Sequence, residues 1–146
     1  MDRKKVTIGE KSIGEGEPVF ITAEIGINHN GSLENAKKLI DVAAEAGCDA
    51  VKFQKRTIEV VYTPEELARP RESVFGNTNG DLKRGLEFGA KEYAEIDQYC
   101  REKGILWFAG FGPIRVRKFG YLKHFGSTAR RERIKRKVYN LGKKAK

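Results

Sequence analysis

Apolar residues follow two different patterns along the chain, short continuous runs and longer helical stripes. The runs 20–25, 48–54 and 105–109 are rich in β-branched and aromatic residues, and each predicts a strand. Between the runs, apolar residues recur every three or four positions, which predicts two amphipathic helices. These positions are Leu33, Ala36, Leu39, Ile40, Ala43 and Ala44 in the first helix, and Tyr93, Ile96, Tyr99 and Cys100 in the second. The order β-α-β-α-β predicts an α/β fold with a parallel sheet and right-handed crossovers.

Capping and turn residues mark where these elements end. Ser32 stands at the N-cap position of the first helix, and Gly47 and Gly104 each follow a helical stripe, where a left-handed residue is expected. Residues 1–19 alternate around a glycine-rich stretch and predict a short hairpin or cap. Turn-forming pairs predict a long polar loop between the second strand and the second helix. These pairs are Thr63-Pro64, Arg69-Pro70 and Asn79-Gly80.

The charge of the chain is unevenly distributed. The sequence holds 29 Lys and Arg against 20 Asp and Glu, a formal net charge of +9. Residues 1–109 hold 16 basic and 19 acidic residues, whereas residues 110–146 hold 13 basic residues and only Glu132. The apolar pattern ends at Ala109 and residues 110–113 predict a turn, so we predict a basic, poorly ordered tail over 110–146. A tail that binds nucleic acid or an acidic partner is the alternative, although no recognition motif with interleaved aromatic residues supports it.

Composition also bears on location and redox state. No run of about 18 apolar residues occurs, so no membrane-spanning helix is expected. The charged N-terminus, residues 1–5, has no apolar segment behind it, so we expect no secretory signal and predict a cytoplasmic protein. Cys48 and Cys100 lie in apolar segments without a C-x-x-C spacing, which favours reduced, buried thiols over a disulfide or a zinc site.

Charged residues stand inside two of the predicted strands. Because side chains alternate along a strand, Glu24 shares a face with Thr22, and Lys52 shares a face with Ala50 and Gln54. Both charges lie toward the carboxyl ends of their strands, where ligands bind in parallel α/β sheets and barrels. Two interpretations stay open. Lys52 fixes an anion while Glu24 accepts hydrogen bonds or moves a proton, or the two form a structural ion pair between neighbouring strands.

The loop 26–31 follows the first strand and precedes a helix, a good place for polar ligand contacts. It contains His29, although a lone loop histidine is more often a solvated residue or a local cap than a catalyst. No His, Asp and Glu cluster offers three metal ligands. The second histidine, His124, lies in the basic tail without a partner that the sequence identifies.

Three ordered segments, 23–32, 50–55 and 80–88, resemble the N-terminal part of the sialic acid (N-acetylneuraminate) synthases. The resemblance covers residues 5–109, and synthases of legionaminic and pseudaminic acid share much of the pattern. It implies that residues 20–109 are the N-terminal portion of a TIM-type (β/α)8 barrel. It also implies an enzyme that condenses phosphoenolpyruvate with an N-acetylhexosamine such as N-acetylmannosamine to give a nonulosonic (sialic) acid.

The resemblance further implies roles for single residues. Lys52 corresponds to the residue that holds the phosphoenolpyruvate anion, and Glu24, the expected catalytic group, and Gln54 correspond to contacts with the sugar. An asparagine after the second strand also reaches the sugar in this family, here Asn77 or Asn79. The family uses a divalent metal, manganese or magnesium, to polarise the aldehyde. It also acts as a homodimer.

The sequence departs from this family after Ala109. A (β/α)8 barrel typically needs about 250 residues, and three strands cannot close it. The two histidines that bind the metal in the family are missing, so we expect no metal ligands in this chain and no turnover by it. We interpret residues 110–146 as out-of-frame or otherwise non-native sequence. A structural fragment that pairs with another chain is a further alternative.

Overall fold

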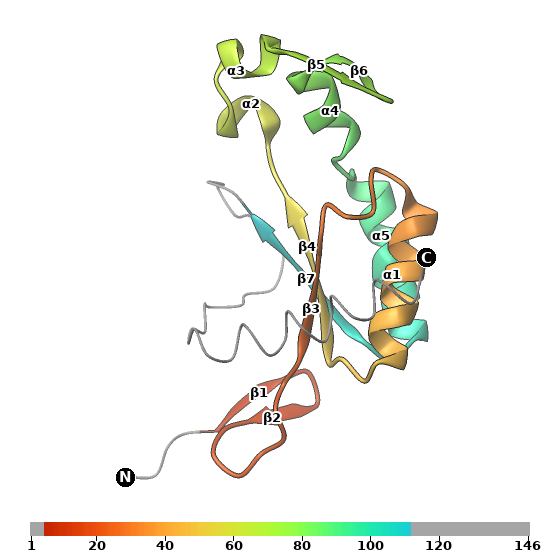
Figure 1. Ribbon diagram of the computed structural model, residues 1–146. Helices are drawn as coiled ribbons and strands as arrows, with labels where there is room; N and C mark the ends of the chain where they lie inside the picture. Colours follow the sequence, from red (N-terminus) through yellow and green to blue (C-terminus); the bar gives the residue numbers. More distant parts are fainter. Residues whose placement is uncertain (1–4, 112–146) are drawn as a thin grey trace.

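A three-stranded parallel sheet is the centre of the fold. The computed structural model describes residues 5–111, and the strands of its main sheet are β3 (Thr22–Gly26), β4 (Ala50–Lys55) and β7 (Leu106–Phe111). β4 lies in the middle and pairs in parallel with β3 on one side and β7 on the other (Figure 1). The predicted parallel arrangement of the three apolar runs is therefore confirmed.

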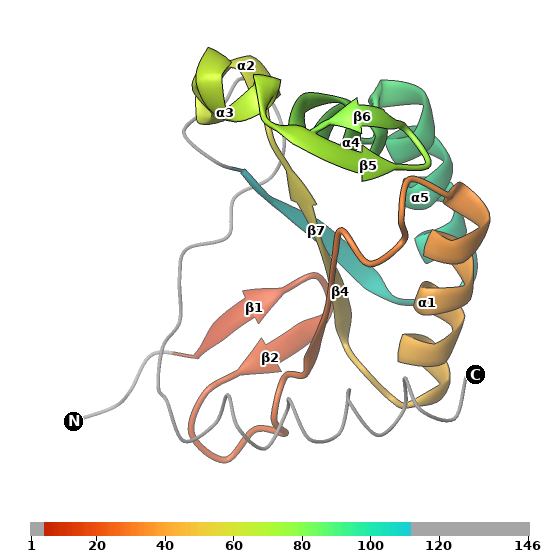
Figure 2. The same cartoon turned by 45° about the horizontal axis from the view of Figure 1, so that its top comes forward.

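Two long helices cover one face of this sheet. They are α1 (Leu33–Glu45) and α5 (Ala90–Glu102), and they lie side by side in both views (Figures 1 and 2). The buried residues between helices and sheet include Ala23, Ile25, Ala36, Ile40, Val51, Phe53, Ile96 and Cys100. Alternate residues of each strand supply this core, so the other face of the sheet is left for polar side chains.

The predicted helix ends are confirmed. Ser32 Oγ accepts a hydrogen bond from the Asn35 amide at 3.2 Å, which caps α1. Gly47 (φ +74°) and Gly104 (φ +65°) follow the C-caps of α1 and α5 in the left-handed conformation. A residue with a Cβ pays a steric cost there, which explains glycine at both positions.

A small hairpin lies at the amino-terminal end of the sheet. Its strands are β1 (Val6–Ile8) and β2 (Lys11–Ile13), paired antiparallel (Figure 2). The Asp49 carboxylate joins it to the sheet, since Oδ1 lies 3.2 Å from Lys11 Nζ and Oδ2 accepts from the Ile21 amide at 2.7 Å. The amino-terminal end of the sheet is thus occupied by the chain itself.

The prediction of a long polar loop after the second strand is wrong. Residues 58–85, named here the carboxyl-end lobe, form several short elements beyond the carboxyl end of β4 (Figure 1). They are α2 (Ile58–Val61), α3 (Pro64–Ala68), β5 (Pro70–Ser73), β6 (Gly76–Thr78) and α4 (Asn79–Gly85).

Local capping explains this order. Thr63 and Glu66 form a capping box at the start of α3, and Thr78 and Asp81 form one at the start of α4. Pro64 takes the first helical position, where its missing N–H costs nothing. The Asn79-Gly80 pair therefore opens a helix instead of making a turn.

Two smaller expectations need correction. β7 continues to Phe111, so Gly110 pairs with Gln54 in the sheet instead of beginning a turn. Both cysteines are free, as predicted, but only Cys100 is buried, and burial raises the pKa of its thiol to about 12. Cys48 is half-buried. The basic segment beyond Phe111, with His124, lies outside the described residues.

No helix within residues 5–111 is long and apolar enough to cross a membrane.

Candidate functional site

Glu24 and Lys52 lie side by side on the sheet face opposite the helices. They are register partners on β3 and β4, and Lys52 Nζ donates to Glu24 Oε2 at 2.6 Å. The side chain of Glu24 is 54% exposed and that of Lys52 is 38% exposed. The predicted shared face is therefore observed, and the two charged groups are accessible at the carboxyl end of the sheet.

The exposure of this pair limits what it adds to the fold. Solvent-exposed ion pairs typically contribute about 0–1 kcal/mol, because water screens the charges and ordering two side chains costs entropy. The Lys52 ammonium has three N–H donors, and Glu24 accepts from one of them. An incoming anion can therefore bind the same ammonium without a large loss of stability.

Gln54 and Gly110 extend the polar face beyond the ion pair. Gln54 is exposed and pairs in register with Gly110 on β7. A Cβ on Gly110 would lie 3.2 Å from Lys52 Cε, so the lysine side chain passes close over this glycine. The sequence analysis missed Gly110 because the break in the apolar pattern favoured a turn there.

The strand β3 ends in an irregularity directly after Glu24. Pairing with β4 shifts between Glu24 and Gly26, and Gly26 has a positive φ of +57°. Such bulges bend a strand and redirect the side chains beside it, and they are common next to active sites. Here the bulge sends the chain away from the site and toward the start of α1.

His29 does not belong to this polar face. It is 1% exposed, stacks on Phe88 with 3.9 Å between ring centroids, and lies 6.0 Å from the Phe53 ring on the helix-covered side. Its Nδ1 accepts a hydrogen bond from the Gly31 amide at 3.1 Å. Burial lowers the pKa of His29 to about 4, although the charge of Glu87 opposes this shift. The interpretation of His29 as a solvated residue is therefore wrong, and its contact with Gly31 is that of a local cap; a ligand contact of His29 stays a prediction.

The two candidate asparagines, Asn77 and Asn79, differ in the hydrogen bonds that their side chains already make. Asn79 begins α4, where its Nδ2 donates to the Glu66 carbonyl at 3.1 Å and its Oδ1 accepts from Arg71 Nη1 at 3.4 Å. Asn77 lies on β6 and is exposed, and its side-chain amide has no hydrogen bond within residues 5–111. Of the two, Asn77 is the one available to a ligand.

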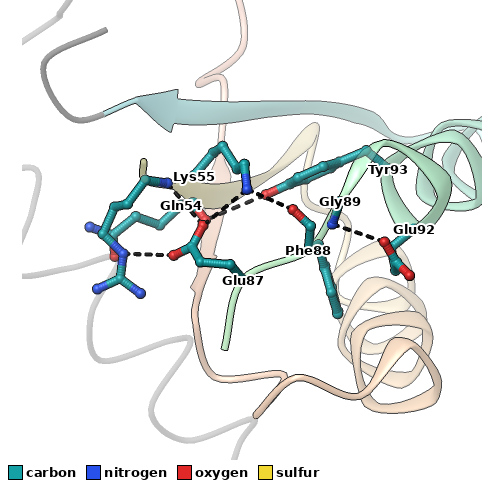
Figure 3. Close-up of polar contacts among 8 residues, drawn as sticks. Gln54, Lys55, Glu87, Phe88, Gly89, Glu92 and Tyr93 are labelled. Atoms are coloured by element: carbon teal, nitrogen blue, oxygen red, sulfur yellow. Dashed lines mark hydrogen bonds and ion pairs between the residues drawn. The ribbon is translucent and has the colours of Figure 1, made fainter. Parts of the chain in front are cut away.

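A largely buried charged cluster, which the sequence analysis missed, lies at the carboxyl end of β4. We name Lys55, Arg56 and Glu87 the Glu87 cluster (Figure 3). Glu87 accepts from Arg56 Nε at 2.8 Å and from the Arg56 amide at 2.9 Å, and Lys55 Nζ lies 3.4 Å from its Oε2. Lys55 also donates to the Phe88 carbonyl at 2.8 Å. The cluster therefore ties the end of β4 to the segment before α5.

Burial makes this cluster different from an ordinary surface ion pair. The side chains of Arg56 and Glu87 are 6% and 9% exposed. Burial disfavours the charge of Arg56, but the hydrogen bond and charge of Glu87 outweigh it and raise the pKa of the guanidinium. Arg56 Nη1 also donates to the Tyr62 hydroxyl at 3.0 Å, while Nη2 has no partner in the described part of the chain.

The same strand end receives one more contact. Tyr93 donates its hydroxyl to the Gln54 carbonyl at 3.4 Å (Figure 3), and burial raises the pKa of this phenol. Together with the Glu87 cluster, this bond holds the backbone of residues 54–56 from the α5 side. The signal in the sequence was a Lys-Arg pair directly after the predicted strand 48–54, together with a glutamate between the apolar Leu86 and Phe88.

The described residues do not fit a resident divalent cation. Within residues 5–111 no three His, Cys, Asp or Glu side chains lie together as a metal-binding group. On the polar face Glu24 is already paired with a cation, Lys52. A hard divalent ion needs several oxygen or imidazole donors, which this set does not provide.

Fold and site together define an α/β protein with an accessible, charged site at the carboxyl edge of a parallel sheet. Residues 39–129, more than half of the chain, match the NeuB family, and the chain belongs to that family. The resemblance to the sialic acid synthases is thereby confirmed. The match also continues past Ala109, where the sequence analysis ended the resemblance, although the division of the chain at that residue stays a prediction.

Several similar proteins are named as synthases of sialic-acid-type sugars. The human N-acetylneuraminate-9-phosphate synthase is 43% identical over 99 residues, which cover 66% of this chain and 28% of the human protein. The pseudaminic acid synthase of Campylobacter jejuni is 35% identical over 120 residues, covering 76% of this chain and 33% of its own length.

A solved structure shows the same likeness. The N-acetylneuraminic acid synthetase of Leptospira borgpetersenii, in complex with citrate, superposes with a TM-score of 0.62 at 32% identity. The superposition covers 76% of this chain and 35% of that one. The chain thus spans about a third of the length of the proteins it matches.

Proposed function

We propose that this chain carries the phosphoenolpyruvate- and sugar-binding face of an N-acetylneuraminate-synthase-like enzyme. The observation that carries the proposal is the accessible row of Glu24, Lys52 and Gln54 at the carboxyl ends of β3 and β4. Family membership supports it, because several of the similar proteins are named as synthases of sialic acids and related sugars. The proposal includes a (β/α)8 barrel, of which β3, β4 and β7 are strands, a homodimeric enzyme and a cytoplasmic location.

In this proposal Lys52 binds the anion. Phosphoenolpyruvate carries a carboxylate and a phosphate, and the lysine ammonium retains donors for one of them after pairing with Glu24. Glu24 holds the ammonium in place before the ligand arrives, so less side-chain entropy is lost on binding. The lysine side chain needs the open space over Gly110 to reach this position.

The sugar is the second substrate. The enol carbon of phosphoenolpyruvate attacks the aldehyde of an open-chain N-acetylhexosamine such as N-acetylmannosamine, water adds to the cationic carbon left behind, and phosphate departs. Glu24 accepts a sugar hydroxyl or moves a proton in these steps, and it is the catalytic group of the proposal. The amides of Gln54 and Asn77 both donate and accept, which suits hydroxyl and N-acetyl groups.

The sequence resemblance assigns polarisation of the aldehyde to manganese or magnesium. The described residues offer no donor set for such an ion. For this chain we therefore propose binding of phosphoenolpyruvate without turnover. Because synthases of several nonulosonic acids are similar to it, the proposed substrate class is an N-acetylated sugar aldehyde and not one particular sugar.

Titration with phosphoenolpyruvate tests the proposal. We expect a saturable rise in the melting temperature of the chain, because a ligand that binds only the folded state stabilises it. Lys52→Met should abolish the rise. Lys38→Met is the matched control, since Lys38 forms an exposed ion pair with Glu34 on α1 and should keep it.

The same samples are then given N-acetylmannosamine and manganese, and phosphate release is measured. We expect none. The binding proposal is overturned if the wild-type chain shows no saturable response at millimolar phosphoenolpyruvate, or if Lys52→Met responds equally. Phosphate release by the chain would contradict binding without turnover and leave the binding proposal standing.

A further inference from the structure

The segment 86–88 contacts the two strand ends that form the site. Glu87 and the Phe88 carbonyl bind Lys55, the last residue of β4, and Arg56, which follows it. On its other side the Phe88 ring stacks on His29, in the loop that follows β3. A single short segment therefore connects the ends of the strands that carry Glu24 and Lys52.

Glu87 holds both the backbone and the side chain of Arg56. One of its carboxylate oxygens accepts the Arg56 backbone amide, and the other accepts Nε of the same residue. The side chains of Arg56 and Glu87 are both largely removed from water. Without the Glu87 carboxylate, the Arg56 guanidinium and the Arg56 backbone amide therefore lose their partner or have to move toward water. Gln54, in β4, lies two residues before Arg56, so a shift of the Arg56 backbone is expected to displace it.

We propose that Glu87 is a positioning residue for the site: its buried carboxylate holds the end of β4 so that Lys52 and Gln54 keep their places on the polar face. The meaning of this for catalysis rests on the proposed function. The geometric claim does not, because the place of Lys52 over Gly110 is measurable without any ligand.

The experiment compares Glu87→Gln with Tyr99→Phe. The glutamine has the same shape but no charge, and its amide group turns a donor toward the donors of Arg56. Tyr99→Phe is the control, since it removes a hydrogen bond at 2.9 Å to Asp41 between α1 and α5, away from the site. Lys55→Met serves as a milder second variant, because this side chain is 30% exposed and its loss leaves the Arg56–Glu87 pair intact.

Two readouts are taken on the folded fraction of each protein. The first is the nuclear Overhauser effect between the Lys52 Hε and Gly110 Hα protons, which reports the close passage of the lysine over the glycine. The second is the dissociation constant for phosphoenolpyruvate. A merely structural role lowers the folded fraction and changes neither readout.

We expect Glu87→Gln to lose the Overhauser effect and to weaken phosphoenolpyruvate binding about tenfold, with Lys55→Met showing a smaller change in the same direction. Tyr99→Phe should keep both wild-type values. The proposal is overturned if Glu87→Gln keeps the Overhauser effect, or, should that variant not fold, if Lys55→Met matches Tyr99→Phe. If the wild-type chain binds no phosphoenolpyruvate, the proposed function fails and the Overhauser effect alone decides the role of Glu87.

Discussion

Two carboxylate–cation pairs stand near the end of β4, and they differ in burial. Lys52 and Glu24 meet at 2.6 Å with side chains 38% and 54% exposed, whereas Arg56 and Glu87 meet at 2.8 Å with 6% and 9% exposed. The distances are alike, but the surroundings are not. A charge that remains in water can exchange its partner for a ligand, while a charge removed from water depends on its partner. The exposed pair therefore suits binding and the buried pair suits structure.

The largest expected effect comes from breaking the buried pair. Glu87→Ala should lower the free energy of unfolding by about 3–5 kcal/mol, because it leaves the Arg56 charge buried without compensation. Urea denaturation measures this loss. The double variant Arg56→Met, Glu87→Leu should recover part of it, since an apolar pair needs no charge partner. The comparison is contradicted if Glu24→Ala lowers the free energy of unfolding as much as Glu87→Ala does.

Acid should weaken the buried region before the exposed one. The pKa of His29 is about 4 in the folded protein and about 6.5 in the unfolded chain, so the unfolded state takes up the proton first as the pH falls. The stability due to neutral His29 is fully present above pH 6.5 and is lost progressively toward pH 4, about 3 kcal/mol in all. Unfolding measured between pH 7 and 4 should show this slope, and His29→Phe should remove it. An equal slope in both proteins would contradict the assignment to His29.

Filling the space beside the exposed pair should change binding and not stability. Gly110→Val places side-chain atoms where Lys52 Cε now passes, and we expect about tenfold weaker phosphoenolpyruvate binding, or ~1.4 kcal/mol. Valine suits a strand, so the melting temperature should change little. Calorimetric titration gives the affinity, with Gly110→Ala as a smaller step in the same series. An unchanged affinity for the valine variant would show that the lysine does not need this space.

The smallest effect belongs to the exposed pair itself. Glu24→Gln should change the free energy of unfolding by less than about 1 kcal/mol. Because salt screens exposed charges, this difference should shrink as the salt concentration rises from 0.05 to 0.5 M, where the screening length falls from roughly 14 to roughly 4 Å. The loss in Glu87→Ala should persist under the same conditions. If the change in free energy of unfolding caused by Glu24→Gln does not depend on salt, the Glu24–Lys52 pair behaves like the buried Arg56–Glu87 pair, and the comparison is contradicted.

The parts of the fold that follow local patterns were predictable from the sequence. The three strands of the parallel sheet, the two long helices and the caps at Ser32, Gly47 and Gly104 depend on residues close together in the chain, and they were found near the predicted positions. The two-residue period of a strand gives the shared face of Lys52 and Gln54, whereas the place of Glu24 beside Lys52 also depends on the register of β3 and β4. The family resemblance was equally readable, since its three segments are continuous.

The missed features depend on contacts between distant residues. Arg56 and Glu87 are separated by 31 positions, and nothing local indicates which of many carboxylates a given arginine will meet. His29 looked like a loop residue because its burial is due to Phe88. The carboxyl-end lobe is a different case, because its capping boxes are local and can be recognised in the sequence. The proline and Asn-Gly pairs of the same segment are also typical of turns, and they favoured the prediction of a loop.

The locality of those capping boxes also bears on the order of folding. Within the carboxyl-end lobe the bonds Thr63–Glu66 and Thr78–Asp81 each join residues three positions apart, and Asn79–Glu66 joins residues 13 apart. The pairing of β3 with β4 instead requires closure of a 28-residue separation between Glu24 and Lys52. Contacts between near neighbours form faster than contacts that close long loops. The carboxyl-end lobe is thus expected to form before the parallel sheet during folding.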